Sequence, residues 1–331
     1  MEFSLVILIL IVVLALVFEF TNGFHDMANS ISTVIGTKVL KPLTAIALAS
    51  VFNFLGATQV SKVAETITSG FISIEMNSEL ILLSTLIGAI FWNILTWYFK
   101  IPSSSTYALI GGLVGSGIIS VGHQNIFWNN ILLKVILPMT ISPLLGFIIS
   151  FYLMKLLDTL ILKMKISKTH NIFGKLQIIS SSFVSLSHGF NDAQKTMALI
   201  SLTLYLQKII PTPAIPVWVI GTCAITMAIG SCFGGLRIVE TVSKKISTMN
   251  TSQGFIAEST ASSLIISASL LGFPLSSTHL IVGSVGGVGA AHDKLKISKS
   301  LIQKLSMTWF FTLPGSALVS GFIYMTLKSF T

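Results

Sequence analysis

Two polar clusters interrupt long apolar runs and carry most of the side chains that could do chemistry. One surrounds Asp26 and the other surrounds Asp192. Ionisable residues inside apolar segments are costly, so they usually face a cavity and serve a function. A single cluster could be a solvated helix end, but its repetition favours function. Beside the clusters, Gly23 and Gly189 predict helix breaks where backbone groups become free to bind ions.

A second repeated motif combines a proline with a run of hydroxyls. Pro102 precedes one Ser-Ser-Thr triplet and Pro274 precedes the other. In each case a single residue separates the proline from the triplet. Proline followed by Ser or Thr predicts a helix start, and such an N-terminus can bind an anion. The alternative role for these hydroxyls is plain helix capping. The residues concerned are Ser104, Ser105, Thr106, Ser276, Ser277 and Thr278. The G-x-x-x-G pairs that follow, Gly111 with Gly115 and Gly283 with Gly287, predict close helix packing.

A third repeated feature is an acid that follows the second apolar segment of each half. Glu65 stands in Val-Ala-Glu-Thr and Glu240 stands in Ile-Val-Glu-Thr. Each acid could be a solvated loop residue. Because the two occur in matching places, a gate or an ion site is the other interpretation.

The surrounding elements must be membrane helices. Of 331 residues, 53% are hydrophobic and only 9% are charged, whereas soluble domains carry about 25% charged residues. This composition excludes a soluble enzyme, a disordered chain and a nucleic-acid binder. An apolar segment of about 20 residues crosses a bilayer as a helix. Ten such segments are expected, at about 3–21, 42–61, 80–99, 105–121, 131–154, 176–206, 214–235, 255–273, 277–291 and 301–327.

The basic residues predict how these segments are oriented. If the N-terminus lies outside and each segment crosses once, fifteen Lys and Arg fall in inside loops and four fall outside. Such an excess marks the cytoplasmic face. Both termini are therefore expected outside, and the basic linker 155–175 is expected in the cytoplasm. Whether 103–121 and 275–291 cross fully or re-enter stays open.

The order of the motifs predicts two related halves. Residues 1–154 form the first repeat and residues 176–331 form the second. Five crossings per half is an odd number, so the second repeat should be inverted in the membrane. Inverted repeats with broken helices are an architecture of secondary transporters. The expected fold is an all-α polytopic membrane protein of about ten segments in two inverted-topology repeats with broken or re-entrant helices.

The paired motifs resemble those of the inorganic phosphate transporter (Pit) family. The resemblance rests on Asn-Gly-Phe-His-Asp-Met-Ala-Asn at 22–29, Ser-His-Gly-Phe-Asn-Asp-Ala-Gln-Lys at 187–195 and both Ser-Ser-Thr runs. It implies a homodimer in the plasma (inner) membrane that imports phosphate with a cation, Na⁺ or H⁺, and needs no cofactor. The Asn-Gly-Phe-His-Asp form looks closer to proton-coupled bacterial members.

The resemblance also implies roles for single residues. The six hydroxyls, together with Gln194 and Lys195, would bind the substrate. The carboxylates would bind the driving cation, whose arrival removes their repulsion toward the anion. The full cation-coupling set is Asn22, Asp26, Asn29, Asn191 and Asp192, of which Asp26, Asn29 and Asp192 would be the metal ligands for sodium.

Two alternatives remain open from the sequence. A sulfate or other oxyanion carrier would use the same hydroxyls. An intramembrane aspartyl protease would use Asp26 and Asp192 as a pair that shares a proton. Hydrolysis would not need the repeated hydroxyl helix starts, which favour the transporter over an enzyme.

Overall fold

The computed structural model describes residues 2–59, 61–73, 78–99, 101, 103–162, 166–246, 249–291 and 299–330. Side chains are not described at 2–4, 28–29, 166–168, 234–246, 299–306 and 308–309. Over the described residues the chain is helical and holds no strand, only an isolated bridge between Ile72 and Ile126. Each of the ten expected apolar segments coincides with a helix.

The helices of the first half run up to and include the long α7, which ends at Ile161. They are α1 (Glu2–Gly36), α2 (Pro42–Ala57), α3 (Val63–Ser69), α4 (Glu79–Tyr98), α5 (Ser105–Val121), the short η2 (His123–Asn125), α6 (Trp128–Ile131), η3 (Leu132–Ile136) and α7 (Leu137–Ile161). The second half contains α8 (Ile166–Leu206), α9 (Val217–Ile246), α10 (Thr251–Leu270), α11 (Ser277–Ala291) and α12 (Lys299–Lys328). The basic segment 155–175 is thus mostly the end of α7 and the start of α8.

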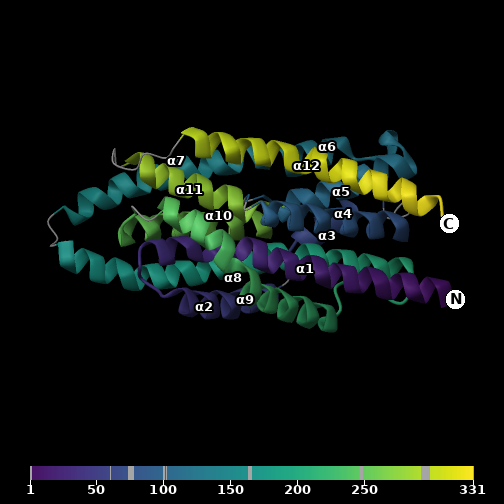
Figure 1. The fold of residues 1–331 in the computed structure, drawn as a ribbon, viewed down its shortest axis with the longest axis horizontal. Helices are drawn as coiled ribbons and strands as arrows, with labels where there is room; N and C mark the ends of the chain where they lie inside the picture. The colour runs from purple at the N-terminus through teal and green to yellow at the C-terminus, as the bar shows by residue number, and fades with distance from the viewer. Residues whose placement is uncertain are drawn as a thin grey trace.

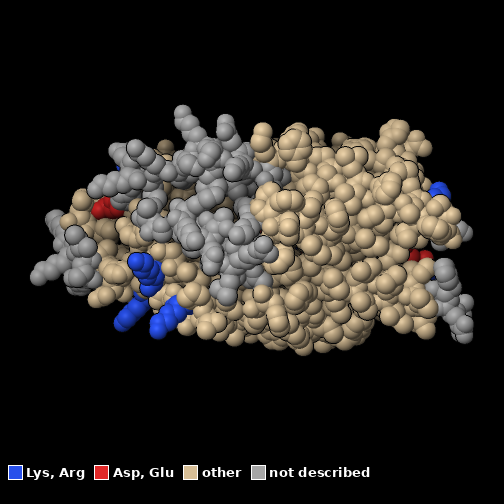
Figure 2. Space-filling model, viewed as in Figure 1, with Lys and Arg blue, Asp and Glu red and all other residues tan. Residues whose placement is uncertain are grey.

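Four of the described helices are long and apolar enough to cross a membrane. They are Leu5–Gly36, Glu79–Tyr98, Trp128–Ile161 and Phe310–Lys328. Large hydrophobic side chains such as Leu144, Leu318 and Phe322 are exposed on these helices, which suits contact with lipid. On the face in Figure 2, the visible charged side chains lie near the two ends, and the described surface between them is uncharged.

Two helical hairpins approach each other from opposite ends of the molecule. Figure 1 shows α4 and α5 in the half that holds both termini, and α10 and α11 in the other half. The tips meet in the middle, where Thr106 Oγ1 donates to the carbonyl of Leu275 at 3.3 Å. In the matching contact, Thr278 Oγ1 donates to the carbonyl of Ser103 at 3.4 Å.

The predicted break beside each Asp cluster is wrong. Both α1 and α8 run as unbroken helices through Gly23 and Gly189 and extend through both halves of the molecule. The glycines serve close packing instead. A Cβ at Gly23 would meet the Met227 carbonyl of α9 at 2.6 Å, and one at Gly189 would meet the Asn53 carbonyl of α2 at 2.1 Å. The Asp clusters therefore lie on continuous helices, whereas the hydroxyl runs lie at the connections between the two helices of each hairpin.

The G-x-x-x-G pairs also pack as expected. The first hairpin lies against α12, where a Cβ at Gly111 would meet the Leu313 carbonyl at 2.3 Å. The second lies against α7, where a Cβ at Gly283 would meet the Pro143 carbonyl at 2.2 Å. Only glycine permits such an approach of two backbones.

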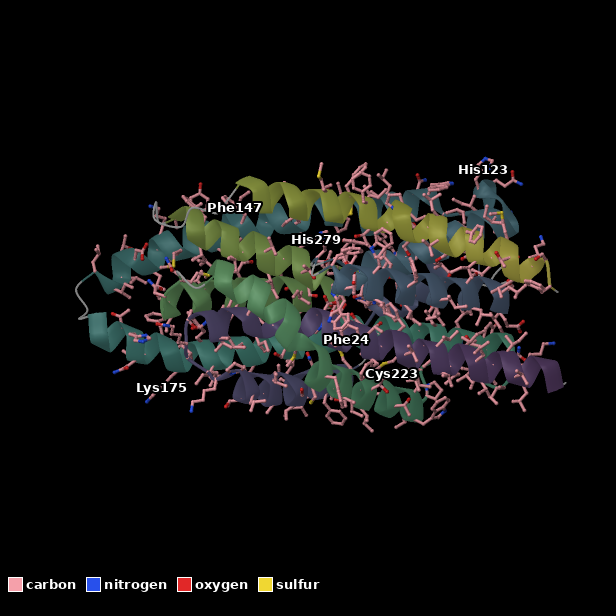
Figure 3. All side chains as sticks on the ribbon, viewed as in Figure 1. Phe24, His123, Phe147, Lys175, Cys223 and His279 are labelled. Carbon is pink, nitrogen blue, oxygen red and sulfur yellow. The ribbon has the colours of Figure 1, made fainter. Side chains whose placement is uncertain are left out.

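The ends of the long helices separate the termini from the middle of the chain. The N- and C-termini lie at one end of the molecule, and α7 and α8 meet at the other. Figure 3 places Lys175 toward the α7–α8 end and His123 toward the terminal end. This separation is the one that the distribution of basic residues predicts.

Candidate substrate and cation site

The first hydroxyl of each triplet caps its helix. Ser104 Oγ accepts from the backbone N–H of Tyr107 at 3.4 Å, and Ser276 Oγ accepts from the N–H of His279 at 3.4 Å. A hydroxyl in this position satisfies one of the unpaired donors of the first turn. The capping alternative thus holds for these two residues, and it leaves the two hydroxyls that follow each of them available for other contacts.

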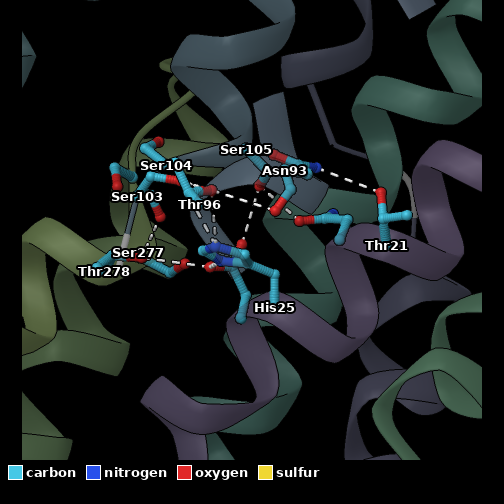
Figure 4. A network of polar contacts seen from close by, with 12 residues as sticks. Thr21, His25, Asn93, Thr96, Ser103, Ser104, Ser105, Ser277 and Thr278 are labelled. Carbon is cyan, nitrogen blue, oxygen red and sulfur yellow. Dashed lines mark hydrogen bonds and ion pairs between the residues drawn. The ribbon is translucent and has the colours of Figure 1, made fainter. Parts of the chain in front are cut away.

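The second hydroxyl of each triplet faces the carboxylate of its own half. Ser105 Oγ donates to Asn22 Oδ1 at 2.6 Å and to Asp26 Oδ2 at 2.9 Å. Ser277 Oγ lies 3.5 Å from Asp192 Oδ2. Figure 4 shows Ser105 and Ser277 from the two hairpins converging on one polar network with His25. The structure therefore unites the two motifs that the sequence repeats.

The third hydroxyl of each triplet crosses to the other half. Thr278 Oγ1 donates to Asp26 Oδ1 at 3.2 Å. Thr106 Oγ1 accepts from Lys195 Nζ at 2.5 Å, and the same ammonium contacts Asp192 Oδ1. Both carboxyl groups are thereby linked to both hairpin tips.

Two histidines complete the polar centre. His188 Nδ1 contacts Asp192 Oδ2, and His25 Nδ1 lies 3.6 Å from Asp26 Oδ1. One ligand atom each from Asp26, His188 and Asp192 lie within 4.8 Å of one another, so these three residues could hold a cation. Both histidines belong to the repeated motifs, but their spacing in the sequence indicated no role for them.

The centre is closed to solvent. Asp26 is 2% exposed, and Asp192 and Lys195 are both 0% exposed. A buried charge is tolerated when it is paired and hydrogen-bonded, as it is here. A further ion that enters this centre must therefore take the place of existing contacts.

Two expected site residues of α8, Asn191 and Gln194, form hydrogen bonds with neighbouring elements. Asn191 Nδ2 donates to the carbonyl of Leu275 at 2.9 Å, and its Oδ1 accepts from Ser269 at 3.1 Å. The Gln194 amide bonds to the connection between α2 and α3, through the Gln59 carbonyl at 2.5 Å and the Ser61 N–H at 3.2 Å. Both contacts hold a hairpin or a connection against α8.

The remaining expected residues either lie away from the polar centre or have side chains that the structure does not describe. Glu65 is exposed on α3 and lines an open pocket with Lys62 and Lys134. The side chains of Asn29 and Glu240 lie outside the described residues.

Two buried acids were missed by the sequence analysis. Glu19 Oε2 accepts from Thr196 at 2.5 Å, one turn before the first polar cluster. Glu258 on α10 accepts from Ser180 at 2.5 Å and from Gln177 at 3.3 Å, and it also contacts Thr33. The signal that could have found them is an acid inside an apolar segment, the same signal that identified Asp26.

Opposed hairpins whose capped tips converge on buried carboxylates are an arrangement that suits a membrane transport protein. The model of the phosphate transporter family matches residues 22–320. The chain belongs to this family, whose members are transporters and not enzymes, so the protease alternative is wrong. It is a multi-pass membrane protein.

Individual relatives agree with this assignment. A probable low-affinity inorganic phosphate transporter of Rhizobium meliloti (strain 1021) is 40% identical over 96% of each chain. A protein of the same description from Bacillus subtilis (strain 168) is 37% identical over 99% of each chain. A solved structure, the sodium-dependent phosphate transporter, superposes with a TM-score of 0.90 at 26% identity, over 98% of this chain and 100% of the other.

Proposed function

We propose that the protein imports inorganic phosphate by symport with a cation, Na⁺ or H⁺, across the plasma (inner) membrane. The observation that carries this proposal is the convergence of both hairpin tips on Asp26 and Asp192. Hydroxyls from both triplets reach these carboxylates directly or through Lys195. An anion carrier needs such donors in a dry centre, and a cation-coupled carrier needs the carboxylates beside them.

The hairpin tips supply the anion cradle. The helices α5 and α11 begin at Ser105 and Ser277, so the positive ends of their dipoles lie at the tips. Backbone N–H groups and hydroxyls there donate to the phosphate oxygens. Hydroxyls carry no fixed charge, which allows the anion to leave again.

The carboxylates supply the coupling. A phosphate anion beside ionised Asp26 and Asp192 would meet like charges in a centre that excludes water. A cation that binds the carboxylates removes this repulsion. Phosphate therefore enters with the cation and not without it.

The packing of the helices supports two inverted repeats. The helix α1 packs on α9 as α8 packs on α2, and α5 packs on α12 as α11 packs on α7. In each comparison, the helix from residues 1–154 and its counterpart from 176–331 change places, and the contact is kept. In this proposal each hairpin re-enters from its own side of the membrane, and their alternate displacement opens the site to either side. From the family resemblance we also propose that the protein forms a homodimer.

Asp→Asn variants test the function in proteoliposomes. We expect D26N and D192N each to abolish phosphate accumulation under an inward Na⁺ or proton gradient, because loss of either carboxylate removes a negative charge on which the link between phosphate entry and cation binding depends. D158N on α7 is the matched control and should accumulate phosphate normally, because Asp158 lies near the end of its helix. Radiolabelled phosphate uptake, with sulfate as a competitor, gives the readout.

The outcomes separate the alternatives. Normal accumulation by both D26N and D192N would remove the carboxylates from the mechanism. Stronger inhibition by sulfate than by unlabelled phosphate would favour the other oxyanion carrier.

A further inference from the structure

The two halves of the centre can be compared residue by residue. A shift of 172 residues relates Ser105 to Ser277, and a shift of 166 relates Asp26 to Asp192. The serine–carboxylate contact occurs in both halves, at 2.9 Å and 3.5 Å. The centre therefore has two matching carboxylate sites, one for each repeat.

The threonine contacts break this correspondence. In one half, Thr278 Oγ1 bonds directly to Asp26 Oδ1 at 3.2 Å. In the other half, the ammonium of Lys195 lies between Thr106 Oγ1 and Asp192 Oδ1 and contacts both. A shift of 166 makes Asn29 the counterpart of Lys195. One repeat therefore carries a cationic side chain where the other carries a neutral amide.

The ammonium is held as an ion would be held. Lys195 is 0% exposed, and its Nζ is bound by a carboxylate oxygen and a hydroxyl oxygen. The other oxygen of Asp192 contacts His188 Nδ1. A mobile cation at Asp192 would have to displace one of these groups, and it would meet the like charge of the ammonium.

We propose that Lys195 is a built-in cation that occupies the Asp192 site, so that only the Asp26 site takes a mobile coupling cation. This inference rests on the proposed function and adds a residue that determines the coupling stoichiometry. The charges then follow directly. Two carboxylates and one ammonium leave a single negative charge to be compensated before phosphate enters, so one mobile cation suffices.

Two substitutions test the role of the ammonium. K195N copies the residue of the other repeat and vacates the second site, and K195R keeps a cation there as the matched control. Radiolabelled phosphate uptake is measured in proteoliposomes against Na⁺ concentration at fixed pH, and against proton concentration without Na⁺. The order in cation reports the number of sites that must fill.

We expect first-order dependence for the natural protein and K195R, and second-order dependence for K195N. An active K195N that keeps first-order dependence would overturn the proposal. If the natural protein accumulates no phosphate, the proposed function itself fails, which is a different result.

A stability measurement covers the case in which K195N does not transport. Removing the ammonium leaves Asp192 uncompensated, so a cation that fills the vacant site should stabilise the variant by mass action. We expect the thermal unfolding temperature of purified K195N to rise with Na⁺ or with lower pH more steeply than that of the natural protein. An inactive K195N whose unfolding temperature responds to both as the natural protein does would overturn the proposal.

Discussion

The residues of the two Ser-Ser-Thr triplets divide the work by position. The first hydroxyl caps a helix, the second faces its own carboxylate, and the third crosses to the opposite half. Helix capping and contact with the carboxylates are thus made by neighbouring hydroxyls, so the two can be separated by mutation. A spacing pattern alone cannot separate them, because all three hydroxyls are of the same chemical kind.

Substitution of the second hydroxyl should weaken phosphate binding. S105A and S277A each remove one donor to a charged ligand, worth about 1.5–3 kcal/mol. This loss corresponds to a KM for phosphate uptake that is about ten- to hundredfold higher. We expect normal abundance in the membrane for both variants and near inactivity for the double variant.

The capping serines provide the control for that experiment. S104A and S276A should each lower the free energy of unfolding by about 1 kcal/mol. The KM of the folded protein for phosphate uptake should stay nearly unchanged. If S105A and S277A behave like these cap variants, their hydroxyls do not touch the anion.

At the scale of the elements, the sequence predicted the helices and misjudged one kind of glycine. Apolar length placed a helix in every expected segment, and proline with hydroxyls placed the starts of α5 and α11. The glycines of the Asp clusters indicated breaks, yet α1 and α8 are continuous. A glycine that admits a neighbouring backbone looks the same in sequence as one that ends a helix. The partners of Glu258, which are up to 225 residues away, could not be read from spacing either.

Close packing at the hairpins can be tested with alanine. G111A and G283A each place a Cβ within 2.3 Å of a carbonyl oxygen of the supporting helix. Overpacking of this kind costs about 1–3 kcal/mol, so both variants should unfold at lower temperature in detergent. G221A on α9 is the matched control, because a Cβ there meets nothing within 4 Å. Equal unfolding temperatures for all three variants would show that the hairpins tolerate a wider separation.

At the scale of the whole molecule, the separation of the termini from the α7–α8 junction allows the orientation in the membrane to be measured. Both termini lie at one end and the α7–α8 junction lies at the other. The excess of basic residues predicts that the junction lies in the cytoplasm. The fold separates two opposite ends, and the distribution of basic residues predicts which of them is inside.

Cysteine labelling of intact cells tests this orientation. Single cysteines are introduced at the exposed His170 and Ser329 in a background that lacks Cys223 and Cys232. An impermeant thiol reagent should label S329C and spare H170C, and permeabilised cells should show both labelled. Labelling of H170C alone in intact cells would reverse the assignment.

The bonds between the hairpin tips have a consequence for energy loss by the cell. Thr106 bonds to the backbone beside Ser276, and Thr278 bonds to the backbone beside Ser104. Because each tip donates one bond and accepts the other, withdrawal of either hairpin breaks both at once. In the proposed mechanism each hairpin re-enters from its own side of the membrane, so these two bonds together keep the site closed to both sides until a hairpin is displaced. If the protein couples phosphate to a cation as proposed, we expect these bonds to keep the empty carrier from dissipating the ion gradient.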